Sequence, residues 1–436
     1  MYKPAILTLS ILAATSVQAE NLELPATAAI IAHSESIERP LDQVTFTDAA
    51  GTQIPLRFTT GLGSAAYHAA GDDDRTFYTL SDRGVNIKCS DDLDITGVDI
   101  CADGKIFPVP NYTPSIYQLS RIKQQWVIAD VVQLKNSAGL PISGLPNPLT
   151  LTDTEEAFDI NGNPIALDPE GLDTEALLQL SDGSFWVSDE YAPSIVHVAA
   201  DGRVLKRLVP AGIESDLSGA GYPVEGALPG ILAKRKLNRG IESIAVSPDE
   251  NFLYFALQSP LANPDKDAYE ASRNVRLFKM DLNTMTILGE YVYVLDLPET
   301  FAADDTSKQN KVKVSEMAAV DTDNLVILER ISNTTKLYQV TLDEASNILD
   351  SEWDSEVTSP SLEQTADLAA AGIEPINKTL ALDSAVDIPG VLPAKVEGIA
   401  IMSDTEIQLI NDNDFGIEGD ATTLVHLRKP QGFFSH

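Results

Sequence analysis

The sequence is poor in the residues on which most hydrolytic and redox centres depend. Its 436 residues include two cysteines and five histidines, and 65 acidic residues face only 30 basic ones. It contains no G-x-S-x-G, P-loop or H-E-x-x-H pattern, which removes the usual signatures of serine hydrolases, nucleotide-binding proteins and zinc proteases. The remaining chemistry is that of carboxylates and arginines working with a bound metal ion. No catalytic residue is predicted individually.

Long apolar runs are also missing, apart from one at the N-terminus. Lys3 precedes an uncharged, mainly apolar run of 13 residues from Ala5 to Val17, and Val17-Gln18-Ala19 suits a signal peptidase. We therefore expect residues 1–19 to be a signal peptide and 20–436 to be one exported domain, periplasmic or extracellular. No later segment reaches the ~20 apolar residues of a membrane span. The net charge of −35 disfavours nucleic acid as a partner. The sequence does not indicate an oligomeric state.

The two cysteines, Cys89 and Cys101, enclose an acidic excursion, "CSDDLDITGVDIC". Export permits oxidation and an even count favours pairing, so a disulfide is predicted between them. The same stretch has Asp92, Asp94 and Asp103 at the spacing of a calcium-binding loop, although the flanking helices of such a loop are missing. It is a second, weaker candidate for an ion site.

What the chain does contain is a repeated hairpin pattern. Each copy has a short apolar run, a turn rich in Asp, Ser, Gly or Asn, and a second apolar run rich in aromatic and branched residues. The copies occupy residues 61–84, 169–191, 240–259, 314–332 and 395–414. Most are followed by two further strands, and four antiparallel strands per repeat are typical of a β-propeller blade.

The predicted fold is therefore an all-β propeller of four-stranded antiparallel blades with inserted loops. Five repeats are readable, and residues 40–60 leave open whether there are five blades or six. The last repeat is one strand short, and an N-terminal strand at 28–36 could complete it. A pair of β-sandwiches is the alternative. Helix is expected only at 361–372.

In a hairpin, the residue before the first strand and the residue after the second lie at the same end. Acids occupy these positions in every repeat, with Glu170, Glu242, Glu316 and Glu397 as the anchors, 72, 74 and 81 residues apart. If the first strands line a central channel, these acids converge on one mouth. The predicted metal ligands are Asp82, Glu170, Asp189, Glu190, Glu242, Glu316, Glu329, Glu397, Asp412 and Asp414.

Clustered carboxylates repel one another unless a cation, an arginine or a proton offsets their charge. All-oxygen ligands suit a hard divalent cation such as Ca²⁺, Mg²⁺ or Mn²⁺. Arg83, Arg239 and Arg330 stand beside these acids, and with Gln258 they are predicted to bind a small anionic substrate such as a phosphate ester. The alternatives are that the acids cap strand ends and that the arginines form ordinary salt bridges.

Several of these blocks resemble the phytase-like domain family, described as having esterase-like activity of phytase. The resemblance rests on "DPEGLDTEALLQLSDGSFWVSDEY", "NRGIESIAVSPDENFLYFALQSPL", "SRNVRLFKMD", "VSEMAAVDTDNLVILER" and "KVEGIAIMSDTEIQLINDNDFG", and it runs from about Gly61 to Leu427. It implies an exported bacterial propeller with metal-assisted hydrolysis of phosphate esters, and it favours Ca²⁺. The chain departs from the family pattern at Ser243, where Gly is usual, at Met317 and in its first block. Two other functions stay open: a non-catalytic calcium-binding propeller that binds a ligand or protein, and a metal-dependent lactonase or carboxylesterase.

Overall fold

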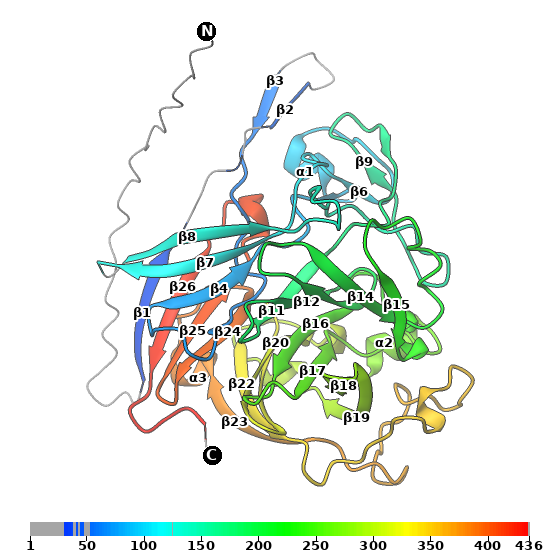
Figure 1. Cartoon of the computed structure of the whole chain (residues 1–436), viewed down its shortest axis with the longest axis vertical. Coiled ribbons are helices and arrows are strands. Elements are labelled where there is room, and N and C mark those ends of the chain that lie inside the picture. The colour runs from blue at the N-terminus through cyan, green and yellow to red at the C-terminus, as the bar shows by residue number, and fades with distance from the viewer. Residues whose placement is uncertain (1–29, 38–40, 42–43, 48–52, 124, 435–436) are drawn as a thin grey trace.

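A computed structural model describes residues 30–434, apart from 38–40, 42–43, 48–52 and 124, and nearly all of its regular structure is β (Figure 1). The prediction of an all-β protein is confirmed. The signal peptide predicted at 1–19 lies outside the described residues. In the described part, none of the helices has the length and apolar character needed to cross a bilayer.

Five sheets follow one another along the chain, and they are antiparallel apart from one added strand. The first contains β4 (Thr76–Leu80), β7 (Ser115–Ile122) and β8 (Gln125–Gln133). The second contains β11 (Thr174–Gln179), β12 (Phe185–Asp189), β13 (Ser194–Val198), β14 (Val204–Pro210) and the parallel β15 (Val224–Leu228). The third contains β16 (Ile241–Val246), β17 (Phe252–Leu257), β18 (Asn274–Asp281) and β19 (Thr286–Val294).

The last two sheets complete the series. The fourth contains β20 (Lys313–Asp321), β21 (Asn324–Arg330), β22 (Thr335–Thr341) and β23 (Asn377–Asp383). The fifth contains β24 (Val396–Ser403), β25 (Glu406–Asn411), β26 (Thr423–Arg428) and β1 (Ile31–Ser36). In the fifth sheet β1 pairs with β26 from Ile31–Arg428 to Ser36–Thr423. The predicted N-terminal strand therefore does supply the missing fourth strand.

One inner strand of each sheet contacts the inner strand of the next. The contacts join β4 to β11, β11 to β16, β16 to β20, and β20 to β24. The segment 62–67 lies beside β4 through two bridges, Leu62–Ser81 and Tyr67–Tyr78. This segment also meets β24, because a Cβ at Gly398 would come within 2.5 Å of backbone atoms of Ala65 and Ala66. The first and last sheets are therefore in contact as well.

The core lies between the sheets rather than on one side of them. All six residues of β16 and all five of β12 are buried, as expected for strands covered on both faces. The aromatic residues Trp186, Phe255 and Phe278 fill the space between the second, third and fourth sheets, and the rings of Phe255 and Phe278 stack at 4.9 Å. Such burial is the main stabilising contribution to the fold.

Smaller elements sit on this frame. Short strands β5 (Ile87–Lys88), β6 (Lys105–Ile106), β9 (Ala157–Phe158) and β10 (Pro164–Ile165) form a separate small sheet. The helices are α1 (Asp92–Thr96), α2 (Lys266–Ala271) and α3 (Ser384–Asp387), with 3-10 turns η1 (Gly230–Lys234), η2 (Pro298–Thr300), η3 (Gln309–Lys311), η4 (Glu352–Asp354) and η5 (Asp414–Gly416). The predicted disulfide joins Cys89 to Cys101 beside α1.

Two expectations about the loops need correction or refinement. Residues 361–372 form turns and not the expected helix, because their buried residues Leu362, Leu368 and Ile373 are six and five residues apart, which is not the spacing of one helix face. The strands β2 (Val44–Thr47) and β3 (Gln53–Leu56) form a two-stranded sheet, which pairs with no other described strand. They add no four-stranded sheet to the five.

Candidate metal centre

Four inner strands carry a β-bulge at a glutamate or, in β20, at the serine just before one. The register shifts between Thr174/Leu177, Ile241/Ser243, Val314/Glu316 and Val396/Gly398. A bulge leaves a residue out of the ladder and redirects its side chain. The glutamates at these bulges are Glu175, Glu242, Glu316 and Glu397. Three of them, all except Glu316, line one cavity.

This cavity has a volume of about 910 Å³ and receives residues from all five sheets. The end of the second hairpin strand contributes one residue from each sheet: Asp82 after β4, Glu190 after β12, Gln258 after β17, Arg330 at the end of β21, and Asp412 after β25. The open ends of the five hairpins therefore meet at this one cavity. The disulfide-linked insertion forms one wall of the cavity, with Lys88, Ser90 and Ala102 directly flanking the two cysteines.

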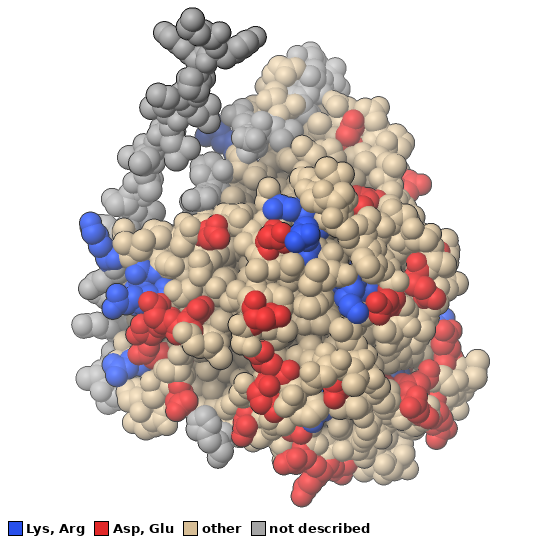
Figure 2. Space-filling view, viewed as in Figure 1, with Lys and Arg blue, Asp and Glu red and all other residues tan. Residues whose placement is uncertain are grey.

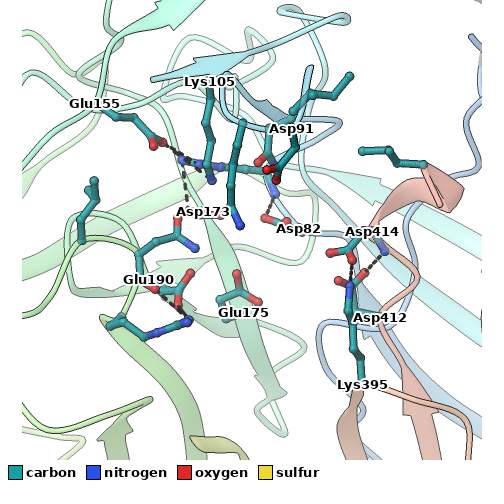
Figure 3. A pocket seen from close by; sticks show the side chains of 18 of the residues that line it. Asp82, Asp91, Lys105, Glu155, Asp173, Glu175, Glu190, Lys395, Asp412 and Asp414 are labelled. Atoms are coloured by element: carbon teal, nitrogen blue, oxygen red, sulfur yellow. Dashed lines mark hydrogen bonds and ion pairs between the residues drawn. The ribbon is translucent and has the colours of Figure 1, made fainter. Parts of the chain in front are cut away.

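Five carboxylates crowd together in this cavity, and we call them the acidic centre. They are Asp82, Asp173, Glu175, Glu190 and Glu242 (Figure 3). They form two triads, Asp82–Asp173–Glu175 and Glu175–Glu190–Glu242, and in each triad one oxygen per residue lies within 4.8 Å of the others. At an effective dielectric constant of ~20, two like charges at that distance repel by roughly 3 kcal/mol. The centre therefore needs cations or protons to hold together.

Burial and mutual repulsion raise the pKa values of the acidic centre. Loss of solvation is the main cause for Asp82 and Glu175, whose pKa values both lie well above the usual range. The largest further contributions are Asp173 for Asp82 and Asp82 for Glu175. Burial, followed by the charge of Glu190, raises the pKa of Glu242 to about 8. The cavity thus favours any ligand that brings positive charge.

Three buried side-chain oxygens in and beside the acidic centre accept no hydrogen bond. Glu242 Oε2, Asp173 Oδ2 and Gln258 Oε1 accept no hydrogen bond from the described residues, although each side chain is 97 to 98% buried. Gln258 is held in place by its Nε2, which donates to Glu190 Oε1 at 2.9 Å. Buried polar atoms are normally satisfied, so these oxygens are free to bind a ligand.

Basic residues surround the acidic centre although the chain has few of them. Eight of the 30 line this cavity: Arg83, Lys88, Lys105, Arg239, Lys311, Lys313, Arg330 and Lys395. On the face drawn in Figure 2, acidic side chains prevail and basic ones are sparse. The concentration of cations at the cavity is therefore a local feature, and it suits an anionic ligand.

The three predicted arginines differ in what they can reach. Arg83 is 1% exposed, and its Nη2 donates to Glu155 Oε1 at 2.7 Å while its Nη1 lies 3.4 Å from Asp173 Oδ2. The rings of Phe107 and Tyr191 lie about it at 5.4 and 5.2 Å. Arg83 thus holds Asp173 in place from inside the protein.

Arg239 and Arg330 occupy the opposite side of the cavity. The Arg239 side chain is 24% exposed; its Nη1 donates to Asn238 O at 3.1 Å and lies 3.7 Å from Glu190 Oε1, and its Nε donates to the Tyr269 hydroxyl at 3.4 Å, which leaves Nη2 for a ligand. Arg330 is nearly buried, donates from Nε to Ser315 Oγ at 2.8 Å and pairs with Glu397. Arg239 is therefore the arginine most open to a substrate.

Ten of the fourteen residues predicted for the site line the cavity. They are Asp82, Arg83, Glu190, Arg239, Glu242, Gln258, Arg330, Glu397, Asp412 and Asp414. Glu397 and Asp414 are paired with Arg330 and Lys395 at its edge. Burial raises the pKa of Asp412 to about 6, although Lys395 and Arg330 counteract part of this.

The other four predicted residues lie elsewhere, and the expectation that they share the mouth is corrected. Glu170 precedes β11 by four residues, and its carboxylate accepts from Gly221 N at 2.6 Å and from Asn136. Asp189 is turned toward Arg207, with Nη2 to Oδ2 at 2.8 Å in a fully buried pair. Both therefore bind protein groups outside the cavity.

Glu316 and Glu329 are also satisfied differently from what the sequence suggested. Glu329 accepts from the Tyr293 hydroxyl at 2.6 Å and from Lys378 at 3.0 Å, on the side of β21 away from the cavity. Glu316 is 1% exposed and accepts from the backbone N–H of Met317 at 3.0 Å. Burial, and to a smaller extent the charge of Glu242, raises the pKa of Glu316 well above its usual range, and Glu316 lies outside the cavity lining.

The sequence interpretation missed Asp173, a member of the first triad, and Glu175, which belongs to both triads. Their signal was present, because "TEALL" in β11 corresponds to "IESIA", "SEMAA" and "VEGIA" in β16, β20 and β24. The anchor of this copy is therefore Glu175, not Glu170 of "PEG". The cavity lysines Lys105, Lys313 and Lys395 carried no comparable pattern.

In the loop between the cysteines, the first residue of the candidate calcium-binding spacing binds backbone amides of the protein. Asp92 begins α1 and is 2% exposed, and its Oδ2 accepts from the backbone N–H groups of Ile100 and Cys101 at 2.7 and 3.1 Å. The Asp92 carboxylate thus holds the loop together through hydrogen bonds from its backbone amides. Asp159, in a similar spacing with Asn161 and Asn163, accepts from both of their backbone N–H groups in the same manner.

Taken together, the described residues define an all-β protein in which five sheets contribute to one cavity of mixed charge with a buried carboxylate centre. The family described as "Phytase-like: Esterase-like activity of phytase" matches residues 59–415, most of the chain. The chain belongs to this phytase-like family, so the resemblance read from the sequence is confirmed.

Similar proteins add little beyond this assignment. An "Uncharacterized secreted protein" of Arthroderma benhamiae is 26% identical over 243 residues, which cover 49% of this chain and 47% of the relative, so the match spans about half the relative's length. A PQQ-bound aldose sugar dehydrogenase from Streptomyces coelicolor is similar over 93% of this chain and 92% of that one, at 9% identity and a TM-score of 0.31. Virginiamycin B lyase from Staphylococcus aureus is similar over 90% of this chain and 99% of that one, at 9% identity and a TM-score of 0.29. The likeness to both solved structures is too distant to bear on function.

Proposed function

We propose that this protein is an exported, divalent-cation-dependent phosphoric ester hydrolase whose site is the cavity around the acidic centre. The observation that carries the proposal is the pair of buried carboxylate triads beside partnerless oxygens of Glu242 and Gln258. Family membership and the relative described as secreted support the assignment and the export. The disulfide is also in keeping with an oxidising compartment.

The proposed framework is a closed propeller of five blades. Its support is the series of inner-strand contacts from β4 to β24 together with the approach of Gly398 to Ala65 and Ala66. In such a ring every blade delivers the end of one hairpin to the same mouth. That arrangement accounts for a site assembled from residues more than 300 positions apart, such as Asp82 and Asp412.

The cation would be held by oxygens of Asp82, Asp173, Glu175, Glu190 and Glu242, with the neutral Gln258 amide oxygen beside them. These are hard ligands, which suits Ca²⁺ first and also Mg²⁺ or Mn²⁺. When bound, a divalent cation lowers the pKa of coordinated water and draws charge from a phosphoryl oxygen. Without it, the acidic centre would repel a phosphate ester.

The protein's own residues then bind and orient the ester. Arg239 is partly exposed at the cavity, and Lys313 lines the same cavity. Their positive charges stabilise the charge that develops on the phosphoryl oxygens in the transition state. Water supplies the oxygen that bonds to phosphorus, the ester P–O bond breaks, and the alcohol leaves with a proton.

The deciding experiment is a hydrolysis assay on protein stripped with chelator and then given Ca²⁺, Mg²⁺ or Mn²⁺. The substrates are a nitrophenyl phosphate monoester, a bis-nitrophenyl phosphate diester, phytate, a nitrophenyl acetate and a lactone. Glu242→Gln is compared with Glu225→Gln, whose exposed side chain pairs with Lys206 outside the cavity. Cation-dependent phosphate release that Glu242→Gln loses and Glu225→Gln keeps supports the proposal.

The other functions correspond to other outcomes of the same assay. Cation-dependent cleavage of acetate or lactone alone would make the protein a metal-dependent lactonase or carboxylesterase. Cation binding without turnover of any ester would make it a non-catalytic binding protein. Either result overturns the phosphoesterase proposal.

A further inference from the structure

The carboxylate of Glu175 has an unusual position. Its side chain is 92% buried, yet no hydrogen bond or ion pair joins it to any residue that the structure describes. It stands on the bulge of β11 and belongs both to the triad with Asp82 and Asp173 and to the triad with Glu190 and Glu242; Figure 3 shows it near Asp82, Asp173 and Glu190. It is the only member common to the two triads.

We propose that the acidic centre binds two divalent cations together, one in each triad, with Glu175 as the carboxylate that they share. This inference rests on the proposed metal dependence and goes further by fixing the number of ions and the bridging residue. Each triad offers three carboxylates, and waters complete the coordination of a hard cation.

Each triad also contains an independent sign of a missing partner. In the first, Asp173 Oδ2 is buried with no hydrogen bond, and the Nη1 of Arg83 faces it from 3.4 Å. In the second, Glu242 Oε2 and Gln258 Oε1 are both buried without a partner. A single ion in one triad would leave the vacant oxygens of the other unexplained.

A pair of cations sharing a carboxylate also has a chemical use. Two adjacent ions can stabilise both the attacking and the leaving oxygen during displacement at phosphorus. The two triads are not equivalent here, because the second has the amide of Gln258 and the more exposed Arg239. The substrate therefore approaches the second triad from the Arg239 side, while the first lies against the buried Arg83.

The test is the stoichiometry of cation binding by the full chain. Chelator-treated protein is titrated with Ca²⁺ in calorimetry at physiological salt, which suppresses weak surface binding. Wild type should bind two ions in the tight phase. Asp173→Asn and Glu242→Gln should each lose one of them, and Glu175→Gln should weaken both by at least roughly tenfold. Glu225→Gln, an exposed control on β15, should bind as wild type.

A second measurement needs no variant and guards against misfolding. Two Mn²⁺ ions that share a carboxylate are exchange-coupled, so wild type with two equivalents of Mn²⁺ should lose the hyperfine pattern of isolated Mn²⁺ in its electron paramagnetic resonance spectrum. One tight ion, two uncoupled ions, or loss of only one ion in Glu175→Gln would overturn the inference and leave the proposed hydrolase standing. Absence of any tight ion overturns both.

Discussion

The two ends of the Gln258 amide have different surroundings. Its Nε2 donates to Glu190 Oε1 at 2.9 Å, whereas its Oε1 accepts no hydrogen bond from any described residue. One end positions a proposed metal ligand, and the other is available as a neutral ligand. Residues that orient metal ligands commonly contribute tenfold to a hundredfold to metal affinity.

Gln258→Leu should therefore weaken Ca²⁺ binding by roughly tenfold to a hundredfold, measured by calorimetry. Without metal, the melting temperature should change little, because leucine removes an unsatisfied oxygen. Gln118→Leu is the matched control, since Gln118 donates to the Tyr78 hydroxyl at 3.1 Å on the first sheet, outside the cavity. Equal affinities in wild type and Gln258→Leu would contradict the assignment.

Arg239→Ala and Arg83→Ala should separate substrate binding from structural support. Arg239 has an exposed edge, so its removal should lower kcat/KM for a phosphate ester at least tenfold, about 1.4 kcal/mol, with little effect on stability. Arg83 is 1% exposed between Glu155 and Asp173, so its loss should destabilise the fold by roughly 3–5 kcal/mol. Urea unfolding and steady-state kinetics measure the two effects. Arg203→Ala, a surface pair with Asp201, serves as the control.

Glu290→Gln should flatten the pH dependence of stability. Glu290 Oε1 accepts from Arg276 Nη1 at 2.6 Å, and burial raises the pKa of Glu290 from 4.5 to about 8 despite that arginine. Between about pH 4.5 and 8 the folded protein keeps a proton that the unfolded chain has released. The free energy of unfolding therefore falls as pH rises through this window, by up to roughly 1.4 kcal/mol per unit.

Glutamine keeps the acceptor for Arg276 but cannot titrate. Urea unfolding at pH 5, 6, 7 and 8 in chelator should therefore show a shallower decline in Glu290→Gln than in wild type. The control is Glu270→Gln, because Glu270 is exposed and pairs only with Lys266. Parallel slopes for wild type and Glu290→Gln would mean that Glu290 is ionised throughout.

Gly398→Ala should loosen the contact between the last and first sheets. An added Cβ would come within 2.5 Å of backbone atoms of Ala65 and Ala66, which cannot move aside as a flexible side chain can. Overpacking of this kind costs about 1–3 kcal/mol, so the melting temperature should fall. Ser403→Ala, at the exposed end of the same strand, should leave it unchanged. If Gly398→Ala melts with wild type, the two sheets are not held by this contact.

The family departures at Ser243 and Met317 have a related explanation. Their positions follow the bulge glutamates Glu242 and Glu316, as Gly398 follows Glu397. Ser243 and Met317 fit there, at 0% and 3% exposure. A Cβ at Gly398, by contrast, would meet the backbone of Ala65 and Ala66.

The strands of the four clear hairpins could be predicted from the sequence because alternating apolar runs and turn residues are local signals. The meeting of Asp82, Glu190, Gln258 and Asp412 also followed, because the two ends of a hairpin have a fixed relation to each other. Side-chain direction did not follow. Asp189 and Glu190 are neighbours, yet Asp189 turns to the buried Arg207 and Glu190 to the cavity, since adjacent strand residues point to opposite faces.

The β-bulges explain why the sequence analysis chose Glu170 in place of Glu175 as a metal ligand. They redirect Glu175, Glu242 and Glu397 into the cavity, and a bulge has no sequence signal that is distinct from an ordinary strand. Glu170 looked equivalent to Glu397 because a glycine follows both, but it lies in the connection before β11. The lysines of the cavity could not be predicted either, because Lys105 and Lys395 come from an inserted loop and a strand connection whose paths depend on tertiary contacts.

The pairing of β1 with β26 sets the order of events during biosynthesis. Ile31 cannot pair in its sheet until Arg428, almost 400 residues later in the chain, has been synthesised. Strand β1 is therefore among the first described segments to be synthesised and among the last that can pair. Until then β26 has an open edge, which any other extended peptide can occupy. A chain that crosses a membrane before it folds would meet this condition, because both ends would reach the same compartment before the fifth sheet is completed.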